Sequence, residues 1–301
     1  MIFSSFNHII SDGVSIENFF KDVFKIYFNE DISKRKFTYF DYLIDLLSSE
    51  KENNRKIKNY LQNKTKNDSL KFYCKSFERK RTSETKYFNF KLDTPKNIVS
   101  TSKEFNMSYN SILLSSITLA LKDLFKNNKI YLEYIFNGRD KNTYYNIFGL
   151  FRRHFPFFIN INPNDSIKEH FKKVNENIED ATNILPNDEL ENIMKFFSEK
   201  DSLRLIYDYQ DVNEIIIYKF KQKNQNKFMN HESPNPNNVN VSKDTLFIHG
   251  IKNGESLQLS FSYDCGYFSE AEIKSLCNII NSYLSLIVDN PLEKVKNLKI
   301  N

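Results

Sequence analysis

The fold of this chain is decided by residues 4–15, which read SSFNHIISDGVS. The apolar start predicts a short buried strand over 2–7, and Gly13 can adopt the positive φ that a sharp turn after the strand requires. His8 and Asp12 are therefore predicted at a strand–turn–helix corner, where polar side chains can point into a cleft. An imidazole suits proton transfer because its pKa lies near neutrality. Asp12 would either orient the imidazole or hold the turn through an ion pair.

Outward from this corner, hydrophobic periodicity separates helices from strands. A helix over 16–27, with Ser15 as its N-cap, follows the turn directly. Further helices are predicted over 37–49, 52–62, 110–125, 166–182, 188–197 and 270–288. Strands are predicted over 87–92, 130–136, 155–161, 204–209, 245–251 and 256–263, the last two joined by a hairpin turn at Asn253-Gly254. The intermixing predicts a mixed α/β fold, with 221–243 a long loop or crossing segment.

Composition excludes several classes of protein. Hydrophobic residues make up 40% of the 301 positions and charged residues 27%, which is the balance of a globular protein. The 43 basic and 38 acidic residues leave a net charge of +5, too small and too dispersed to favour nucleic-acid binding. Cys74, Cys265 and Cys277 form no CxxC pair, so we expect no metal site and a reducing, cytoplasmic location. No apolar run is long enough for a membrane span, and the N-terminus lacks the basic region of a secretory signal.

Residues 4–15 resemble the signature segment of the condensation domains of nonribosomal peptide synthetases, in which two adjacent histidines and three further residues precede Asp-Gly. Weaker matches follow in the family's order along almost the whole chain. They are FTYFDY at 37–42, NGR at 137–139, FGLF at 148–151, YDYQ at 207–210, and Tyr263-Asp264 with Phe268 before the last helix.

The resemblance implies a two-lobed fold like that of chloramphenicol acetyltransferase, with a tunnel between the lobes. Carrier proteins dock on opposite faces of such domains and present phosphopantetheine arms, so this chain would need no metal or cofactor of its own. The implied reaction is amide bond formation between a carrier-bound thioester and a carrier-bound amine. Carrier proteins and neighbouring synthetase domains are the implied partners.

The resemblance also implies roles for single residues. His8 matches the family's second histidine, which lies at the tunnel centre. In the family this histidine acts either as a general base or by positioning the amine and stabilising the tetrahedral intermediate. Asp12 matches an aspartate that is mainly structural, Gly13 matches the turn glycine, and Asn7 replaces the first histidine. Three further motif positions would lie along or near the tunnel: Gly138, Arg139 and Gly149.

The sequence departs from the family in two further places. Arg152-Arg153-His154 stands where Val-Asn-Thr is usual, which changes either surface and lobe contacts or the tunnel and carrier contacts. The signature also begins at residue 8, more than a hundred residues earlier than in the family. We therefore expect 1–100 to be a remnant of the N-terminal lobe, with the HxxxDG segment and connecting helices, and 101–301 to be the C-terminal lobe.

This early start has consequences for stability and activity. The missing part normally supplies one tunnel wall and a basic partner for the aspartate. Helix 16–27 would then expose an apolar face, an aggregation liability. The chain would be a fragment of a longer polypeptide, a decayed gene product or half of a split protein. A half of a split protein would need a partner polypeptide to supply the other lobe. Without the missing lobe, the truncation would abolish activity.

Other functions remain open on the sequence alone. The alternatives are a degenerate or split domain that only docks carrier proteins or neighbouring domains, and a stand-alone HxxxD acyltransferase that uses coenzyme A thioesters. An epimerization domain is disfavoured because Val14-Ser15-Ile16 stands where Ser-Trp-Arg is typical. Heterocyclization domains replace the signature histidine with aspartate, which this chain does not. The acidic pair Asp208 and Asp211 is better explained by a strand-end turn than by acid–base chemistry.

Overall fold

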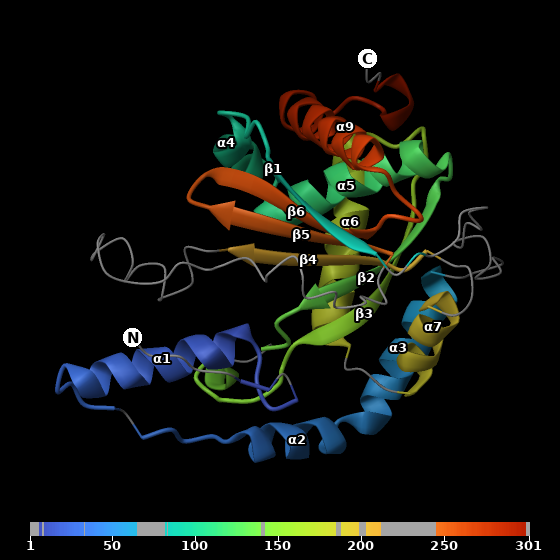
Figure 1. The fold of residues 1–301 in the computed structure, drawn as a ribbon. Helices are drawn as coiled ribbons and strands as arrows, with labels where there is room; N and C mark the ends of the chain where they lie inside the picture. Colours follow the sequence, from blue (N-terminus) through green and yellow to red (C-terminus); the bar gives the residue numbers. More distant parts are fainter. Residues whose placement is uncertain are drawn as a thin grey trace.

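The computed structural model describes residues 6–7, 9–32, 34–64, 82, 84–139, 142–184, 188–198, 203–211 and 245–298. They form one mixed sheet, with helices covering one of its faces and a second group of helices near its lower end (Figure 1). The mixed α/β fold predicted from the intermixed strands and helices is confirmed. The loop predicted at 221–243 lies outside the described residues.

In the described part of the chain the sheet has six strands in the order β1-β6-β5-β4-β2-β3. Their bounds are β1 Thr85–Lys91, β2 Lys129–Phe136, β3 Arg153–Asn160, β4 Leu205–Asp211, β5 Leu246–Asn253 and β6 Ser256–Asp264. β4 runs parallel to both of its neighbours, and the other pairs are antiparallel. Each strand coincides with a predicted one, and Gly254 takes the φ of +63° that the β5–β6 hairpin turn requires.

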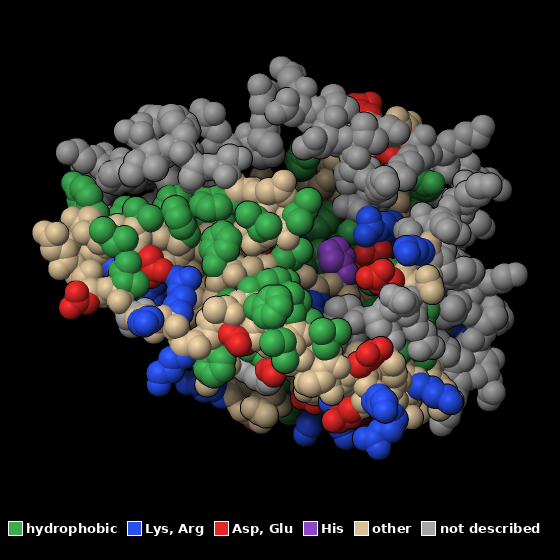
Figure 2. Space-filling model, turned by 90° about the horizontal axis from the view of Figure 1, so that it is seen from below, with side chains coloured by type: hydrophobic (Ala, Val, Ile, Leu, Met, Phe, Trp, Pro, Cys, Tyr) green, Lys and Arg blue, Asp and Glu red, His purple; other side chains and the backbone are tan. Residues whose placement is uncertain are grey.

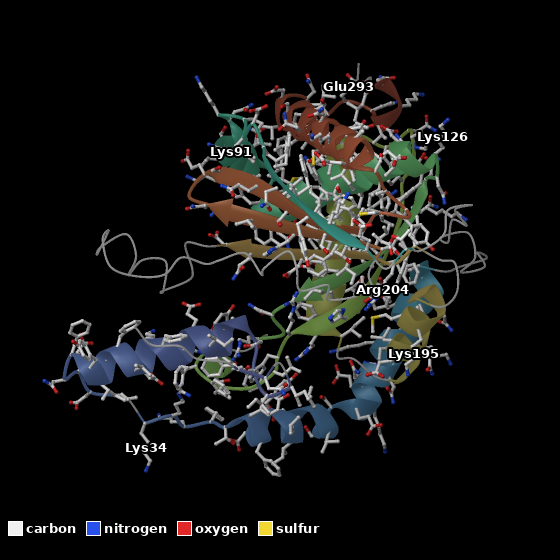
Figure 3. All side chains as sticks on the ribbon, viewed as in Figure 1. Lys34, Lys91, Lys126, Lys195, Arg204 and Glu293 are labelled. Atoms are coloured by element: carbon white, nitrogen blue, oxygen red, sulfur yellow. The ribbon has the colours of Figure 1, made fainter. Side chains whose placement is uncertain are left out.

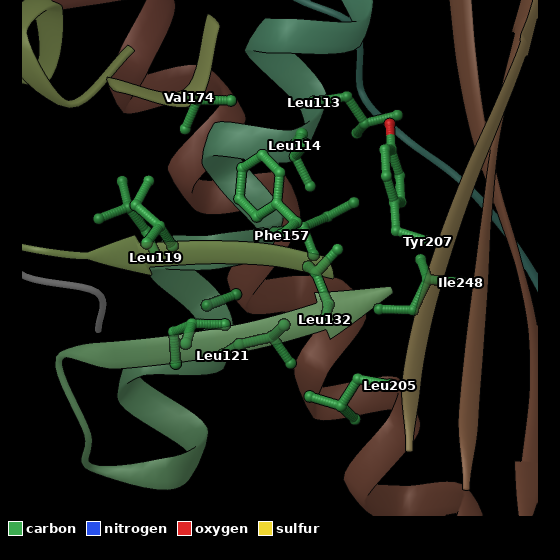
Figure 4. Close-up of a cluster of buried hydrophobic side chains, with 14 of the residues drawn as sticks. Leu113, Leu114, Leu119, Leu121, Leu132, Phe157, Val174, Leu205, Tyr207 and Ile248 are labelled. Atoms are coloured by element: carbon green, nitrogen blue, oxygen red, sulfur yellow. The ribbon is translucent and has the colours of Figure 1, made fainter. Parts of the chain in front are cut away.

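Three helices, α5 (Tyr109–Phe125), α6 (Ile167–Asn183) and α9 (Glu270–Asp289), pack together over one face of the sheet. α5 is buried almost all round, because α6 and α9 contact it as well as the sheet. Figure 4 shows the core between them, where side chains from α5 meet Leu132, Phe157 and Tyr207 from the strands. Burial on both sides explains why the sequence of α5 is so apolar.

The remaining helices are shorter. α4 (Ile98–Glu104) precedes α5, and α7 (Asp188–Ser198) follows α6. α7 was predicted, whereas α4 was not, because its seven residues IVSTSKE are too few to show helical periodicity. α9 begins at residue 270, as predicted, and Ser269 and Glu272 form a capping box at its start.

The N-terminal part lies below the sheet in Figure 1 as α1 (Gly13–Tyr27), α2 (Tyr39–Ser48) and α3 (Glu50–Lys64). An aromatic cluster around Tyr42 and Phe151 fastens α2 to the segment that leads into β3. The edge strand β1 comes from within 1–100 yet pairs with β6 along its whole length. The expected division at residue 100 therefore separates an edge strand from the rest of its sheet.

Candidate functional site

The corner that carries HxxxDG is built by Asn7 and Asp12. The Asn7 side chain accepts from the Ile9 N–H (2.9 Å), and its carbonyl accepts from the Ile10 N–H (3.1 Å) and the Ser11 hydroxyl (3.0 Å). These bonds close a tight turn between Asn7 and Ser11. His8 itself, like residues 2–5 of the predicted strand, lies outside the described residues, and Phe6 and Asn7 have no regular secondary structure.

The start of α1 corrects two predictions. Asp12, not Ser15, is the N-cap: its extended backbone (φ −118°, ψ 178°) lets its carboxylate accept from the Ser15 N–H at 2.8 Å. Gly13 is the first helical residue and does not have a positive φ, and a Cβ placed on it would contact nothing within 4 Å. The turn is made by hydrogen bonds to Asn7 and to the Asp12 side chain, so it does not depend on the conformational freedom of Gly13.

Asp12 is buried, and its carboxylate ties the corner to two distant segments. Oδ1 accepts from Arg139 Nη2 at 2.8 Å, and Oδ2 accepts from the Phe151 N–H at 3.0 Å. Both side chains of the ion pair are almost inaccessible to solvent. Together with Ser15, these groups satisfy the carboxylate, so Asp12 holds the turn through an ion pair.

The basic partner of Asp12 is therefore on this chain. The expectation that the missing lobe supplies it is wrong, because Arg139, from the NGR motif, occupies that place. Arg139 also donates to the carbonyl oxygens of Tyr144 and Ile147 and lies 4.0 Å above the ring of Phe151. We call this buried assembly of Asp12, Arg139, Ser15, Gly149 and Phe151 the Asp12 knot.

The two motif glycines pack closely within and beside the knot. Gly149 exchanges two hydrogen bonds with the Ser15 hydroxyl, its N–H donating at 2.9 Å and its carbonyl accepting at 2.6 Å. A Cβ on Gly149 would lie 2.2 Å from the ring of Tyr39. Gly138 has a φ of +65°, and a Cβ there would lie 1.8 Å from the carbonyl oxygen of Phe151. The structure thus brings Asp12, Arg139, Gly138 and Gly149 together from three separate segments.

The Arg152-Arg153-His154 departure follows the knot directly. Arg153 is buried and donates to the Tyr42 hydroxyl (2.9 Å from Nη2) and the Gly138 carbonyl (3.1 Å). Arg152 pairs with Asp208 at 3.0 Å, and His154 Nδ1 lies 3.2 Å from Glu133 Oε2. None of these three is a simple surface substitution, since each contacts another element of the fold.

Charged side chains line the sheet face opposite the helical layer. Asp208 lies directly across β4–β5 from His249, whose Nε2 is 3.8 Å from the carboxylate. Glu133, on β2, accepts from Arg204 at 2.8 Å. Burial alone would raise the pKa of Glu133, but hydrogen bonds from His154 and Arg204 outweigh it, and the net pKa is below its ordinary value. The sequence did not indicate Glu133 and Arg204 as candidate site residues, because a single charge within an apolar strand has no distinctive pattern.

The other candidate residues take part in structural contacts. Asp211 pairs with Lys252 at 2.5 Å at the end of β4, so both acidic residues of that strand are in ion pairs. Cys265 and Cys277 are free thiols, and burial raises the pKa of Cys277 to about 12. Cys74 lies outside the described residues. Within the described ranges no group of His, Cys, Asp and Glu is arranged to hold a metal ion, and no helix is long and apolar enough to cross a membrane.

Comparison with known proteins identifies the family. A sequence model of the condensation domain matches residues 1–301. The chain belongs to the condensation-domain family. The resemblance drawn from residues 4–15 and the later motifs is therefore confirmed. A search of curated proteins found no match.

Solved condensation-type domains share the fold at low sequence identity. The epimerization domain from the third module of tyrocidine synthetase B is 17% identical, with a TM-score of 0.66 over 94% of this chain and 68% of its own. The condensation domain of the monacolin K polyketide synthase is 13% identical, with a TM-score of 0.71 over 96% of this chain and 70% of its own. A four-domain nonribosomal peptide synthetase bound to AMP and glycine has a TM-score of 0.71 at 15% identity, over 96% of this chain and 23% of its own.

Proposed function

We propose that this chain takes part in nonribosomal peptide synthesis by joining a carrier-bound acyl or aminoacyl thioester to a carrier-bound amine, with His8 at the reaction centre. The observation that supports this most is the Asp12 knot. It fixes the far end of the HxxxDG corner, while Asn7 closes the turn around residue 8. A corner held from both sides suits a histidine that must meet two substrates in one geometry.

The proposed reaction needs one proton acceptor and no bound cofactor. The amine nitrogen attacks the thioester carbonyl carbon, and a tetrahedral intermediate with a negatively charged oxygen forms. The C–S bond then breaks, an amide is left on the downstream arm, and the thiolate of the upstream phosphopantetheine takes up the proton that the amine lost. His8 would relay that proton or hold the amine and the intermediate in place.

Asp12 is unsuited to the role of proton acceptor in this scheme. Its carboxylate already accepts from a guanidinium and from two backbone N–H groups, and it is buried. His8 is the motif residue left to exchange a proton, and Asp12 is its positioning residue.

Substitution of His8 tests this proposal in the native polypeptide that contains this chain. The assay supplies an upstream carrier loaded with an aminoacyl thioester and a downstream carrier loaded with an amino acid, and mass spectrometry detects the product on the downstream arm. We expect His8→Ala to lower the rate about 100-fold or more, as loss of a proton-transfer group does. Lys103→Ala, on the exposed side of α4, is the control and should leave the rate unchanged. An undiminished rate in His8→Ala would show that His8 is not catalytic.

A docking role is the second candidate, and one observation favours it. Figure 2 shows hydrophobic side chains gathered over the face formed by α1 and α2. The exposed ones on these helices are Phe19, Ile26, Tyr27, Phe40, Ile44 and Leu47. The apolar face predicted for helix 16–27 is thus exposed. A polypeptide that supplies the rest of the family fold would cover it, since the chain spans about two thirds of the single-domain relatives.

A further inference from the structure

Three side chains that can carry charge meet on the sheet face opposite the helical layer. Asp208, on β4, lies directly across from His249 on β5, and Arg152 binds the same carboxylate from the segment before β3. Figure 3 shows Arg204 at the end of the sheet nearest α7, where it pairs with Glu133. Because Arg204 precedes β4 and Asp208 lies four residues further along the chain, the Arg152–Asp208–His249 cluster is separate from the Glu133–Arg204 pair.

His249 faces the carboxylate of Asp208 without a hydrogen bond to it. Its Nε2 is buried and, in the described part of the chain, has no hydrogen-bond partner. Nε2 lies 3.8 Å from Asp208 Oδ2, which is too far for a hydrogen bond but within reach of an ion pair once the ring is protonated. Although Nε2 is buried, the side chain as a whole is 27% exposed. Nδ1 is therefore the ring nitrogen left for a molecule at this face to contact.

The surroundings of His249 favour a neutral ring that can take up a proton. Burial lowers its pKa below the ordinary value of 6.5, the Asp208 carboxylate opposes this shift, and the charge of Arg152 adds to it. From the next strand, β6, the uncharged Ser260 lies opposite His249. Once protonated, the ring would be stabilised by Asp208, whose carboxylate Arg152 holds in place through a hydrogen bond of 3.0 Å.

Arg152 connects this cluster to the proposed reaction centre. It directly follows Phe151, whose N–H donates to the Asp12 carboxylate at 3.0 Å, and Asp12 is four residues from His8. The segment that fixes the HxxxDG corner therefore also anchors Asp208 beside His249. Since valine is usual in the family where this chain has Arg152, that anchor is a feature of this chain and not of the family.

We propose that His249 accepts the proton that the incoming amine must lose before it can attack the thioester. This inference rests on the proposed function, whose scheme starts from the uncharged amine. An α-amino group has a pKa of about 7.7–8.0, so at neutral pH most of it is an ammonium ion without a free electron pair. One N–H bond of the ammonium breaks, its proton binds His249 Nδ1, and the nitrogen regains its electron pair. The imidazolium then pairs with Asp208 until the proton passes to water, and His8 keeps its role in the later steps.

Two acceptors of different charge test this in the carrier assay with the native polypeptide that contains this chain. The downstream carrier is loaded either with an α-amino acid or with its aminooxy counterpart, whose nitrogen is already uncharged at neutral pH. Without a proton acceptor only the uncharged fraction of the amino acid, about a tenth at pH 7, can react. We expect His249→Gln to lower the rate with the amino acid about tenfold at pH 7 and to leave the rate with the aminooxy acid almost unchanged. The loss should vanish toward pH 9, where the amino group is mostly uncharged.

A matched control and a second readout separate proton transfer from a structural role. His154→Gln changes the histidine of the same sheet face that contacts Glu133, and it should leave both rates unchanged. In the full chain without carriers, the imidazole NMR signals of His249 should titrate below pH 6.5, and the midpoint should rise in Arg152→Gln. If His249→Gln does not fold, Asp208→Asn replaces it. Loss of that carboxylate lowers the pKa of His249 further, so the rate with the amino acid should again fall more than the rate with the aminooxy acid.

Equal losses with both acceptors, a loss that persists at pH 9, no loss at all, or a His249 that is already protonated at pH 7 would each overturn the inference. Amide formation by the wild-type polypeptide would leave the proposed function intact in all of these cases. No amide from the wild-type polypeptide with either acceptor would instead refute the proposed function, and the role of His249 would fall with it.

Discussion

At the scale of single residues, the Asp12–Arg139 ion pair determines the geometry of the corner. The pair is buried, so removing one partner leaves an uncompensated charge out of contact with water. We expect Arg139→Met to lower the free energy of unfolding by about 3–5 kcal/mol, measured by urea denaturation. Lys172→Met, which breaks the exposed pair with Glu176, is the control and should cost no more than about 0.5 kcal/mol. Equal small losses in both variants would contradict a buried role for the pair.

Gly138 and Gly254 offer a comparison within the same chain. Both have nearly the same positive φ, +65° and +63°, so alanine strains the backbone equally at either position. Only at Gly138 would the new Cβ meet a backbone atom, the carbonyl oxygen of Phe151. We expect Gly254→Ala to lower the free energy of unfolding by about 1–2 kcal/mol, and Gly138→Ala to lower it by at least about 2 kcal/mol more. Thermal or urea unfolding measures both, and similar costs would show that the knot tolerates a shift of Phe151.

The limits of sequence reasoning are clearest at this scale. The NGR and FGLF motifs could be found, but nothing in them says that Arg139 pairs with a residue 127 positions earlier. The burial of Arg153 was equally unpredictable, because arginine is ordinarily exposed. His8 could be proposed from the motif, and it lies outside the described residues. Short motifs locate a site, and the long-range contacts that complete it come only from the fold.

At the scale of elements, prediction succeeded where periodicity was strong. α5, α9 and the β5–β6 hairpin were all predicted, because apolar spacing and an Asn-Gly turn each mark a local structure. It failed at the cap of α1, since Asp12 and Ser15 are both good caps and only the structure shows which one accepts the N–H. The short α4 left no periodic signal at all.

α6 carries a residue that should make stability depend on pH. Burial lowers the pKa of His170 to about 4, below its ordinary value of 6.5. Between these values the unfolded chain binds a proton that the folded chain does not, so stability falls as the pH drops from 6.5 toward 4. The loss should approach about 3 kcal/mol across that range.

His170→Gln removes the titrating group and provides the comparison. Urea denaturation at several pH values between 4 and 7 should show a flatter dependence in this variant than in the wild-type chain, while carboxylates contribute equally to both. Parallel curves would mean that His170 does not remain neutral in the fold.

At the scale of the whole molecule, two surfaces distinguish this chain. The face of α1 and α2 exposes large apolar side chains (Figure 2), and the sheet face opposite the helical layer carries the ion pairs Arg152–Asp208 and Arg204–Glu133. The Asp12 knot lies between these regions, since Asp12 begins α1 and Phe151 precedes Arg152.

The central claim is that this family member forms an amide between two carrier-bound groups, and one assay tests it directly. The native polypeptide that contains this chain is given a carrier-bound aminoacyl thioester together with either a carrier-bound amino acid or the free amine, and in parallel the same acyl group as a coenzyme A thioester. Intact-mass spectrometry follows the acceptors. The account predicts amide on the downstream carrier and little transfer from coenzyme A. Transfer from coenzyme A alone, or no amide with the loaded carriers, would contradict it.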